Sequence, residues 1–118
     1  MRYPFIGQSG PTDCGPACLA MILAFHRRPA PLAELCSLAG TGIRGTSLAG
    51  LAHAARQAGF EAHGVRSADT TLPCGETPLI AHLREEAFAH FVVVFECRPG
   101  QVLVADPARG MGWSRAEL

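Results

Sequence analysis

The sequence predicts an α+β fold, with N-terminal helices packed on a C-terminal antiparallel β-sheet. The first half of the chain holds apolar segments at helical spacing, each followed by glycine or proline. The second half holds short runs rich in valine, and a Pro-Gly turn separates two of them. Helices followed by antiparallel strands define the α+β class. A length of 118 residues, 48% of them hydrophobic, suits one domain over residues 1–118 with a core of its own.

The first predicted helix covers about residues 14–26. Asp13, directly before it, is a residue type that caps helix N-termini. Residues 17–25 are apolar without interruption, so protein should surround this helix on every side. Pro29 then ends it, because proline disfavours helical conformation in the residue before it.

Two shorter helices are predicted over residues 31–39 and 47–58. Leucines recur along the inward face of the first, and Gly40 follows it. Thr46 or Ser47 can cap the second, whose leucines and alanines also fall on one face. We therefore expect two amphipathic helices that cover the apolar first helix.

The second half of the chain predicts strands. "RPG" separates the two runs richest in valine, which indicates an antiparallel hairpin between them. A helical turn is expected in the final residues. The predicted strands, in chain order, are residues 60–65, 78–83, 90–97, 101–106 and a short one at 111–113.

Charge and hydropathy exclude several classes of function. The formal net charge is zero, so the chain has no basic field that would attract nucleic acid. No apolar run reaches the roughly 18 to 20 residues that span a bilayer. The first residues also lack the charged head and apolar stretch of a signal peptide. We therefore expect a cytosolic domain that neither binds nucleic acid nor enters the membrane.

The cysteines do not form a disulfide or metal pattern. They are five in number and lack CxxC spacing, so reduced thiols are expected. No Cys/His cluster has the paired spacing of a zinc site, and we expect neither a metal nor a cofactor.

One cysteine, Cys14, falls where a loop rich in glycine and proline becomes the apolar helix. Unpaired N–H groups at a helix N-terminus stabilise a thiolate, which is the reactive form of cysteine. Gly10 and Gly15 would leave room for a substrate backbone. The position alone is equally compatible with a small packed cysteine, because free cysteines are often buried.

A nucleophilic cysteine needs a base, and the base needs an orienting group. His90 begins one strand of the predicted hairpin, and Asp106 ends the other. The hairpin brings them near one another, but a register shift of one residue would turn one of them to the opposite face. His90 at an exposed strand edge and Asp106 as a turn former before Pro107 are the alternatives.

A fourth residue completes a possible acyl-transfer site. Gln8 lies six residues before Cys14, and its amide could donate to a developing oxyanion together with the Cys14 N–H. A single glutamine in a loop does not by itself indicate a catalytic site. Together with a cysteine, a histidine and an aspartate, it becomes the fourth part of an acyl-transfer site.

The chain resembles the C39 family of bacterial cysteine peptidases, which have a papain-like fold. The resemblance implies that Cys14 is the nucleophile, His90 the general base and acid, Asp106 the group that orients His90, and Gln8 the oxyanion donor. The matching segments are "QSGPTDCGPACLAMIL" (8–23), "GTSLAGLAHAARQAGF" (45–60), "HFVVV" (90–94) and "VADPARG" (104–110).

The family also implies a substrate and a setting. Its members cleave leader peptides after a double-glycine-type motif as bacteriocin-like peptides are exported. They usually form the N-terminal cytosolic domain of an ABC transporter, so its transmembrane and nucleotide-binding domains would be the partners. Three alternatives stay open: a non-catalytic domain that docks export substrates, another acyl-transfer enzyme on the same fold, and a purely structural cytosolic domain.

Overall fold

The computed structural model describes residues 2–62, 74–85 and 88–115. Three helices precede an antiparallel sheet with strand order β1-β2-β3-β4, which confirms the predicted α+β class. The elements are α1 (Cys14–Phe25), α2 (Leu32–Ala39), α3 (Leu48–Gln57), the short 3-10 helix η1 (Cys74–Glu76), β1 (Leu79–Glu85), β2 (Phe88–Arg98), β3 (Gln101–Asp106) and β4 (Gly110–Arg115).

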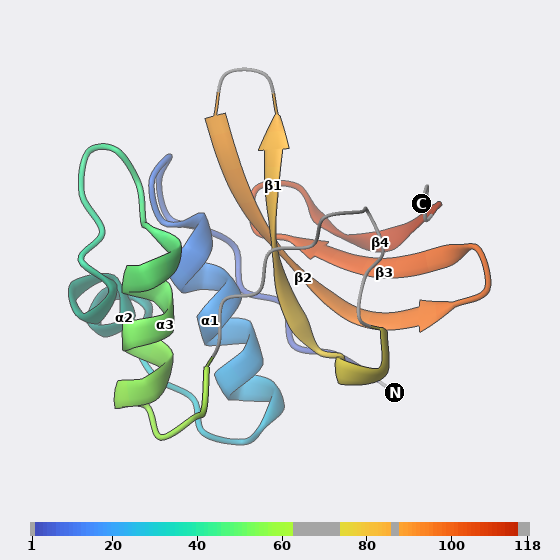
Figure 1. Cartoon of the computed structure of the whole chain (residues 1–118), viewed down its shortest axis with the longest axis horizontal. Coiled ribbons are helices and arrows are strands. Elements are labelled where there is room, and N and C mark those ends of the chain that lie inside the picture. The colour runs from blue at the N-terminus through green and yellow to red at the C-terminus, as the bar shows by residue number, and fades with distance from the viewer. Residues whose placement is uncertain (1, 63–73, 86–87, 116–118) are drawn as a thin grey trace.

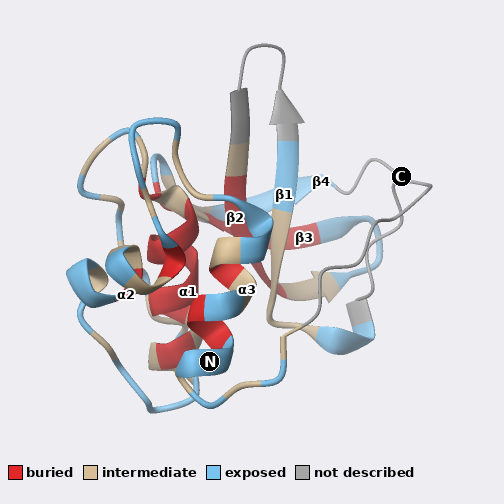
Figure 2. Cartoon of the chain, turned by 60° about the vertical axis from the view of Figure 1, so that its left-hand side comes forward, coloured by how far each residue is buried: buried red, intermediate tan, exposed pale blue. Residues whose placement is uncertain are grey.

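The helices and the sheet form two adjoining layers. Figure 1 shows α1 between the sheet and the other two helices, with α2 and α3 on its far side. Most of α1 is buried, as Figure 2 shows. This confirms the expectation that an all-apolar helix is surrounded by protein.

The core joins α1 to the sheet on one side and to α2 and α3 on the other. Each large aliphatic or aromatic side chain buried there contributes about 1.5–3 kcal/mol relative to an exposed position. The buried cluster consists of Cys18, Leu19, Ala20, Met21 and Leu23 of α1, Leu35 and Ala39 of α2, Leu51, Ala54 and Ala55 of α3, Phe91, Val93 and Phe95 of β2, and Leu103 and Ala105 of β3.

The beginning of α1 packs tightly on β2. A Cβ at Gly15 would lie 3.3 Å from the Phe91 ring and 3.4 Å from Thr46 Cβ. The expectation that Gly15 leaves room for a substrate is therefore wrong, because Phe91 and Thr46 fill that space. At Gly10, by contrast, a Cβ would meet nothing within 4 Å.

The segment after α3 differs from the prediction of a strand over residues 60–65. Residues 60–62 form no strand, and the remainder lies outside the described residues. The reason is local: Phe60 N donates to Ala55 O, and the Arg56 guanidinium donates to Ala62 O at 2.7 Å and 3.2 Å. These bonds hold the chain against the end of α3 in place of a strand partner. The predicted C-terminal helical turn also lies outside the described residues.

The cysteines depart from the expectation of five reduced thiols. Cys97 is disulfide-bonded, whereas Cys14, Cys18 and Cys36 are free. In the parts of the chain that the structure describes, no helix combines the length and the apolar character that crossing a membrane requires.

Candidate active site

Cys14 is the first residue of α1, and its side chain is partly exposed. Asp13 occupies the N-cap position, and its backbone oxygen accepts a hydrogen bond from Ala17 N at 3.0 Å. The expectation that the Asp13 side chain caps the helix is wrong, because its carboxylate turns back toward Ser9 and Gly10. The backbone alone therefore starts the helix at the cysteine.

His90 and Asp106 form a direct hydrogen bond from neighbouring strands. His90 Nε2 lies 2.7 Å from Asp106 Oδ1, and the two side chains are only 14% and 15% exposed. Ala108 N donates to the same carboxylate oxygen at 2.9 Å. Because a carboxylate only accepts, the proton of a neutral imidazole lies on Nε2. Nδ1 of His90 is then the nitrogen left to act as a base.

A β-bulge in β2 puts His90 and Asp106 on the same face of the sheet. Near the turn, Arg98 pairs with Gln101, whereas beyond the irregularity between Val94 and Glu96 the pairing becomes Val93 with Ala105. Continued by one residue, this register sets residue 92 opposite Asp106, and His90 lies two residues earlier on the same face. Without the bulge, Asp106 would face Val93 and His90 would point to the other side.

Gln8 lies beside the end of β3. Its backbone N–H donates to Pro107 O at 3.0 Å, and its side-chain Nε2 donates to Gly10 O at 2.6 Å. Among the described residues, Gln8 Oε1 is the buried side-chain atom without a hydrogen-bond partner. The glutamine is thus sheltered, and the residue after Asp106 anchors it.

Cys18 belongs to the same buried cluster as Ala105, the residue before Asp106 in β3. It is fully buried one turn after Cys14, and burial raises the pKa of its thiol, with Cys14 and Asp106 acting in the same direction. No hydrogen bond joins Cys14 to His90 in the described ranges, and in unliganded sites such contacts often form only with substrate.

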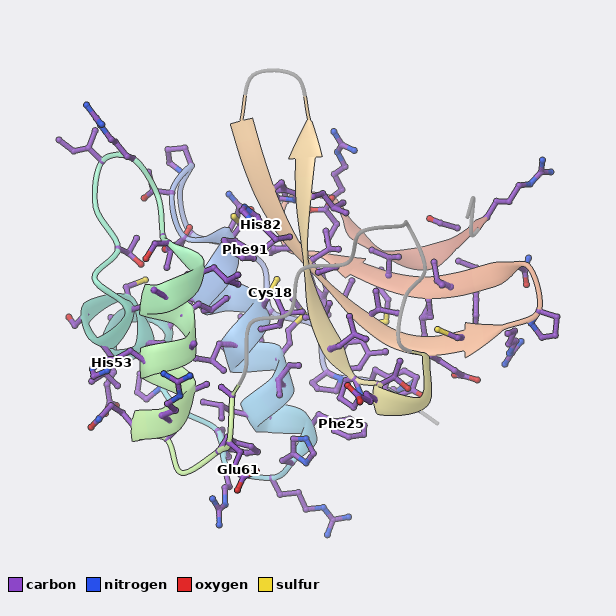
Figure 3. The ribbon with its side chains drawn as sticks, viewed as in Figure 1. Cys18, Phe25, His53, Glu61, His82 and Phe91 are labelled. Atoms are coloured by element: carbon purple, nitrogen blue, oxygen red, sulfur yellow. The ribbon has the colours of Figure 1, made fainter. Side chains whose placement is uncertain are left out.

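His82 is a further residue near the start of α1. Its ring is exposed and stacks on Phe91, with centroids 4.3 Å apart and planes 13° apart. Figure 3 shows the pair at the Cys14 end of α1, while Phe25 marks the opposite end. Strand alternation in the sequence could not predict that His82 lies near the start of α1, because this position depends on how β1 pairs with β2. No group of three or more His, Cys, Asp or Glu side chains suited to a metal occurs within the described ranges.

The arrangement of helices on an antiparallel sheet, with a cysteine opening the central helix and a His–Asp pair on two strands, is that of papain-like cysteine peptidases. The match to known proteins is more specific. Residues 2–117 match the model of the peptidase C39 family, and the chain belongs to this family.

Relatives of this chain include long transport proteins. It is 36% identical over 108 residues to the lactococcin-G-processing and transport ATP-binding protein LagD of Lactococcus lactis. That alignment covers 89% of this chain and 15% of the relative, so the chain spans a small part of LagD.

Solved structures of similar proteins have the same fold. A double glycine motif protease from an AMS/PCAT transporter, in complex with the leader peptide, superposes with a TM-score of 0.86 at 31% identity, covering 98% of this chain and 81% of that chain. The peptidase domain of Streptococcus ComA gives a TM-score of 0.84 at 28% identity, covering 97% and 87%.

Proposed function

We propose that this chain is a cysteine endopeptidase that cleaves leader peptides after a double-glycine-type motif and thereby matures exported bacteriocin-like peptides. The observation that supports this most is the 2.7 Å hydrogen bond between His90 Nε2 and Asp106 Oδ1. It gives a histidine a fixed orientation and a free Nδ1, which is what a base for a thiol requires. Membership of the C39 family supports the same class of reaction.

The reaction begins at Cys14. Its thiol proton moves to His90 Nδ1, and the thiolate attacks the carbonyl carbon of the second glycine, so that a C–S bond forms. The negative charge on the carbonyl oxygen is held by the Cys14 N–H and by the Gln8 amide, which has a second N–H besides the one donated to Gly10.

The intermediate then collapses and releases its products. The C–N bond breaks as His90 gives its proton to the leaving amine, which frees the mature peptide. Water, deprotonated by His90, attacks the thioester carbonyl. The C–S bond then breaks, Cys14 regains a proton from His90, and the leader leaves with a C-terminal glycine carboxylate. Asp106 keeps the imidazole oriented and stabilises its protonated form throughout.

The names of similar proteins support the choice of substrate. LagD is a lactococcin-processing protein, and the double glycine motif protease was crystallised with a leader peptide. A cut after two small residues implies a narrow cleft beside Cys14 that excludes side chains. The upstream part of the leader would bind as an amphipathic helix on an apolar surface, a common mode of peptide recognition.

The same relatives support a proposal for the chain's setting. We propose that it is the N-terminal domain of an ABC exporter, on the cytosolic face of the bacterial inner membrane. Its partners would be the transmembrane and nucleotide-binding domains of that transporter, together with the precursor peptide. LagD, which is several times longer than the segment matched here, supports this setting.

Mass spectrometry of a precursor incubated with this chain tests the proposal. A precursor with a Gly-Gly leader should yield two products, and the new leader should end in the second glycine. A matched precursor with valine in place of that glycine should stay intact, because its side chain would not fit beside Cys14. Binding of the leader without cleavage would instead support a docking domain. Cleavage or amide transfer elsewhere would support another acyl-transfer enzyme.

A further inference from the structure

We infer that Asp13 is a positioning residue that fixes the Gln8 amide in the oxyanion site; this inference rests on the proposed function. Asp13 directly precedes the nucleophile and is only 4% exposed. Within the described ranges, no other charged residue is buried to this extent. A carboxylate is costly to bury unless hydrogen bonds compensate it. Its partners therefore indicate what it holds in place.

All three hydrogen bonds to the Asp13 carboxylate come from the loop that follows Gln8. Ser9 donates to Oδ2 from its backbone N at 2.9 Å and from Oγ at 2.6 Å. Gly10 N donates to Oδ1 at 3.0 Å. A helix cap would accept from the first turn of α1, and Asp13 makes no such bond. Its side chain is thus committed to the loop and not to the helix.

The same loop orients the Gln8 amide. The group of Gln8 that faces Gly10 O at 2.6 Å must be the NH2, because a carbonyl oxygen only accepts. Gly10 is therefore held at both ends, with its N–H on Asp13 and its carbonyl on Gln8. One amide hydrogen of Gln8 is used in this way, and the position of Gly10 decides where the other one points.

A second anchor makes the position of Asp13 decisive. Gln8 N donates to Pro107 O, next to Asp106, which fixes the backbone of Gln8 relative to β3. Asp13 fixes the following two residues relative to α1 and Cys14. The segment between these anchors is short. Loss of the Asp13 contacts would leave the Gln8 backbone in place but free its side-chain amide to rotate away from the oxyanion.

Asp13→Asn tests the inference. Whichever way the new side-chain amide is turned, its NH2 would face the backbone N–H of either Ser9 or Gly10, and one hydrogen bond would be lost. Cleavage kinetics of a Gly-Gly precursor are measured for wild type, Gln8→Ala, Asp13→Asn and the double variant. We expect Gln8→Ala to lower kcat about 100-fold and Asp13→Asn to lower it about 10-fold or more, with KM within about 2-fold of wild type.

The double variant distinguishes positioning from a merely structural role. If Asp13 acts through Gln8, the double variant cleaves within about 2-fold of Gln8→Ala alone, because residues that act as a unit are not additive. Tyr3→Phe is the stability control: it removes the Tyr3–Glu96 hydrogen bond and should leave kcat unchanged. Tyr3 stacks on Phe25, at the end of α1 opposite to Cys14.

Two further measurements keep the inference testable if Asp13→Asn does not fold or the wild type does not cleave. Ser9→Ala removes one of the three bonds and should lower kcat less, again only when Gln8 is present. Independently of activity, the side-chain amide resonances of Gln8 should exchange slowly with solvent in wild type and faster in Ser9→Ala and Asp13→Asn.

The inference is overturned if Asp13→Asn cleaves like wild type, or if it lowers kcat by the same factor with and without Gln8. Unchanged exchange of the Gln8 amide would overturn it as well. Failure of the wild type to cleave any Gly-Gly precursor would contradict the proposed function alone, and the amide-exchange measurement would then decide on Asp13.

Discussion

At the scale of single residues, the reactivity of the free cysteines follows from their surroundings. Cys14 is partly exposed at the start of α1. Cys18 is fully buried, and burial raises its pKa. Burial also raises the pKa of Cys36, with the charge of Asp13 acting in the same direction. A raised thiol pKa leaves less thiolate at neutral pH, so Cys18 and Cys36 should react slowly.

We therefore predict that iodoacetamide modifies Cys14 well before Cys18 and Cys36 at neutral pH. Peptide mapping by mass spectrometry at short reaction times measures the three rates in one sample. Cys14→Ala is the control, and it should lose the fast phase. Equal rates at the three positions would contradict the assignment of Cys14 as an activated thiol.

Asp106 provides a second prediction, because its oxygen, and not only its charge, contacts His90. An asparagine can present a carbonyl oxygen to His90 Nε2 and to Ala108 N, whereas an alanine presents nothing. Asp106→Asn should lower kcat less than about 10-fold and Asp106→Ala about 100-fold, with little change in KM. Equal losses in the two variants would mean that charge, and not orientation, is what Asp106 supplies.

At the scale of elements, α2 and α3 pack at a contact that only glycine permits. A Cβ at Gly50 would overlap the carbonyl oxygen of Ala39, at the end of α2. Alanine is otherwise the better helix former by about 1 kcal/mol. The overlap should outweigh this gain, since overpacking costs about 1–3 kcal/mol.

Gly50→Ala is therefore predicted to lower the Tm, by about 4–8 °C for each kcal/mol lost. Gly112→Ala is the matched control, because a Cβ at that position in β4 meets nothing within 4 Å. Its Tm should stay near the wild-type value. A Gly50→Ala protein as stable as wild type would show that the two helices can move apart at little cost.

At the scale of the whole molecule, the sequence predicted the elements that local patterns define. The apolar run after Cys14 predicted α1, and the "RPG" turn predicted the hairpin of β2 and β3. The face shared by His90 and Asp106 could not be predicted, because it depends on a bulge between Val94 and Glu96. A bulge reflects tertiary packing and twist, and no local sequence signal marks it here.

The sequence also did not predict the hydrogen-bond partners of the Asp13 carboxylate, for a related reason. Its position before α1 is that of a helix cap, and the local pattern favours that interpretation. The fold instead buries its carboxylate against Ser9 and Gly10. The packing of the loop decides which of two nearby sets of donors the carboxylate accepts from. The sequence pattern does not contain that information.

The buried Asp13 carboxylate gives a prediction for stability against pH. Burial alone would raise its pKa, but the hydrogen bonds from Ser9 and Gly10 outweigh burial and lower it below 3.8. A lowered folded-state pKa stabilises the protein above the unfolded-state value, and this contribution is lost as pH falls further through the folded-state value. Urea unfolding should therefore find Asp13→Asn clearly less stable than wild type near about pH 6 and the two closer near about pH 2.5. A constant difference across that range would contradict an ionised, hydrogen-bonded Asp13.

The account depends most on Cys14 acting as the nucleophile beside the His90–Asp106 pair, and the cleavage of a Gly-Gly precursor by wild type and by Cys14→Ala tests this most directly. Wild type should release a leader that ends in the second glycine. Cys14→Ala should cleave at least about 10⁴-fold more slowly, while fluorescence anisotropy should find its Kd for the leader within about 3-fold of wild type. A Cys14→Ala protein that cleaves the precursor at the wild-type rate would contradict the account.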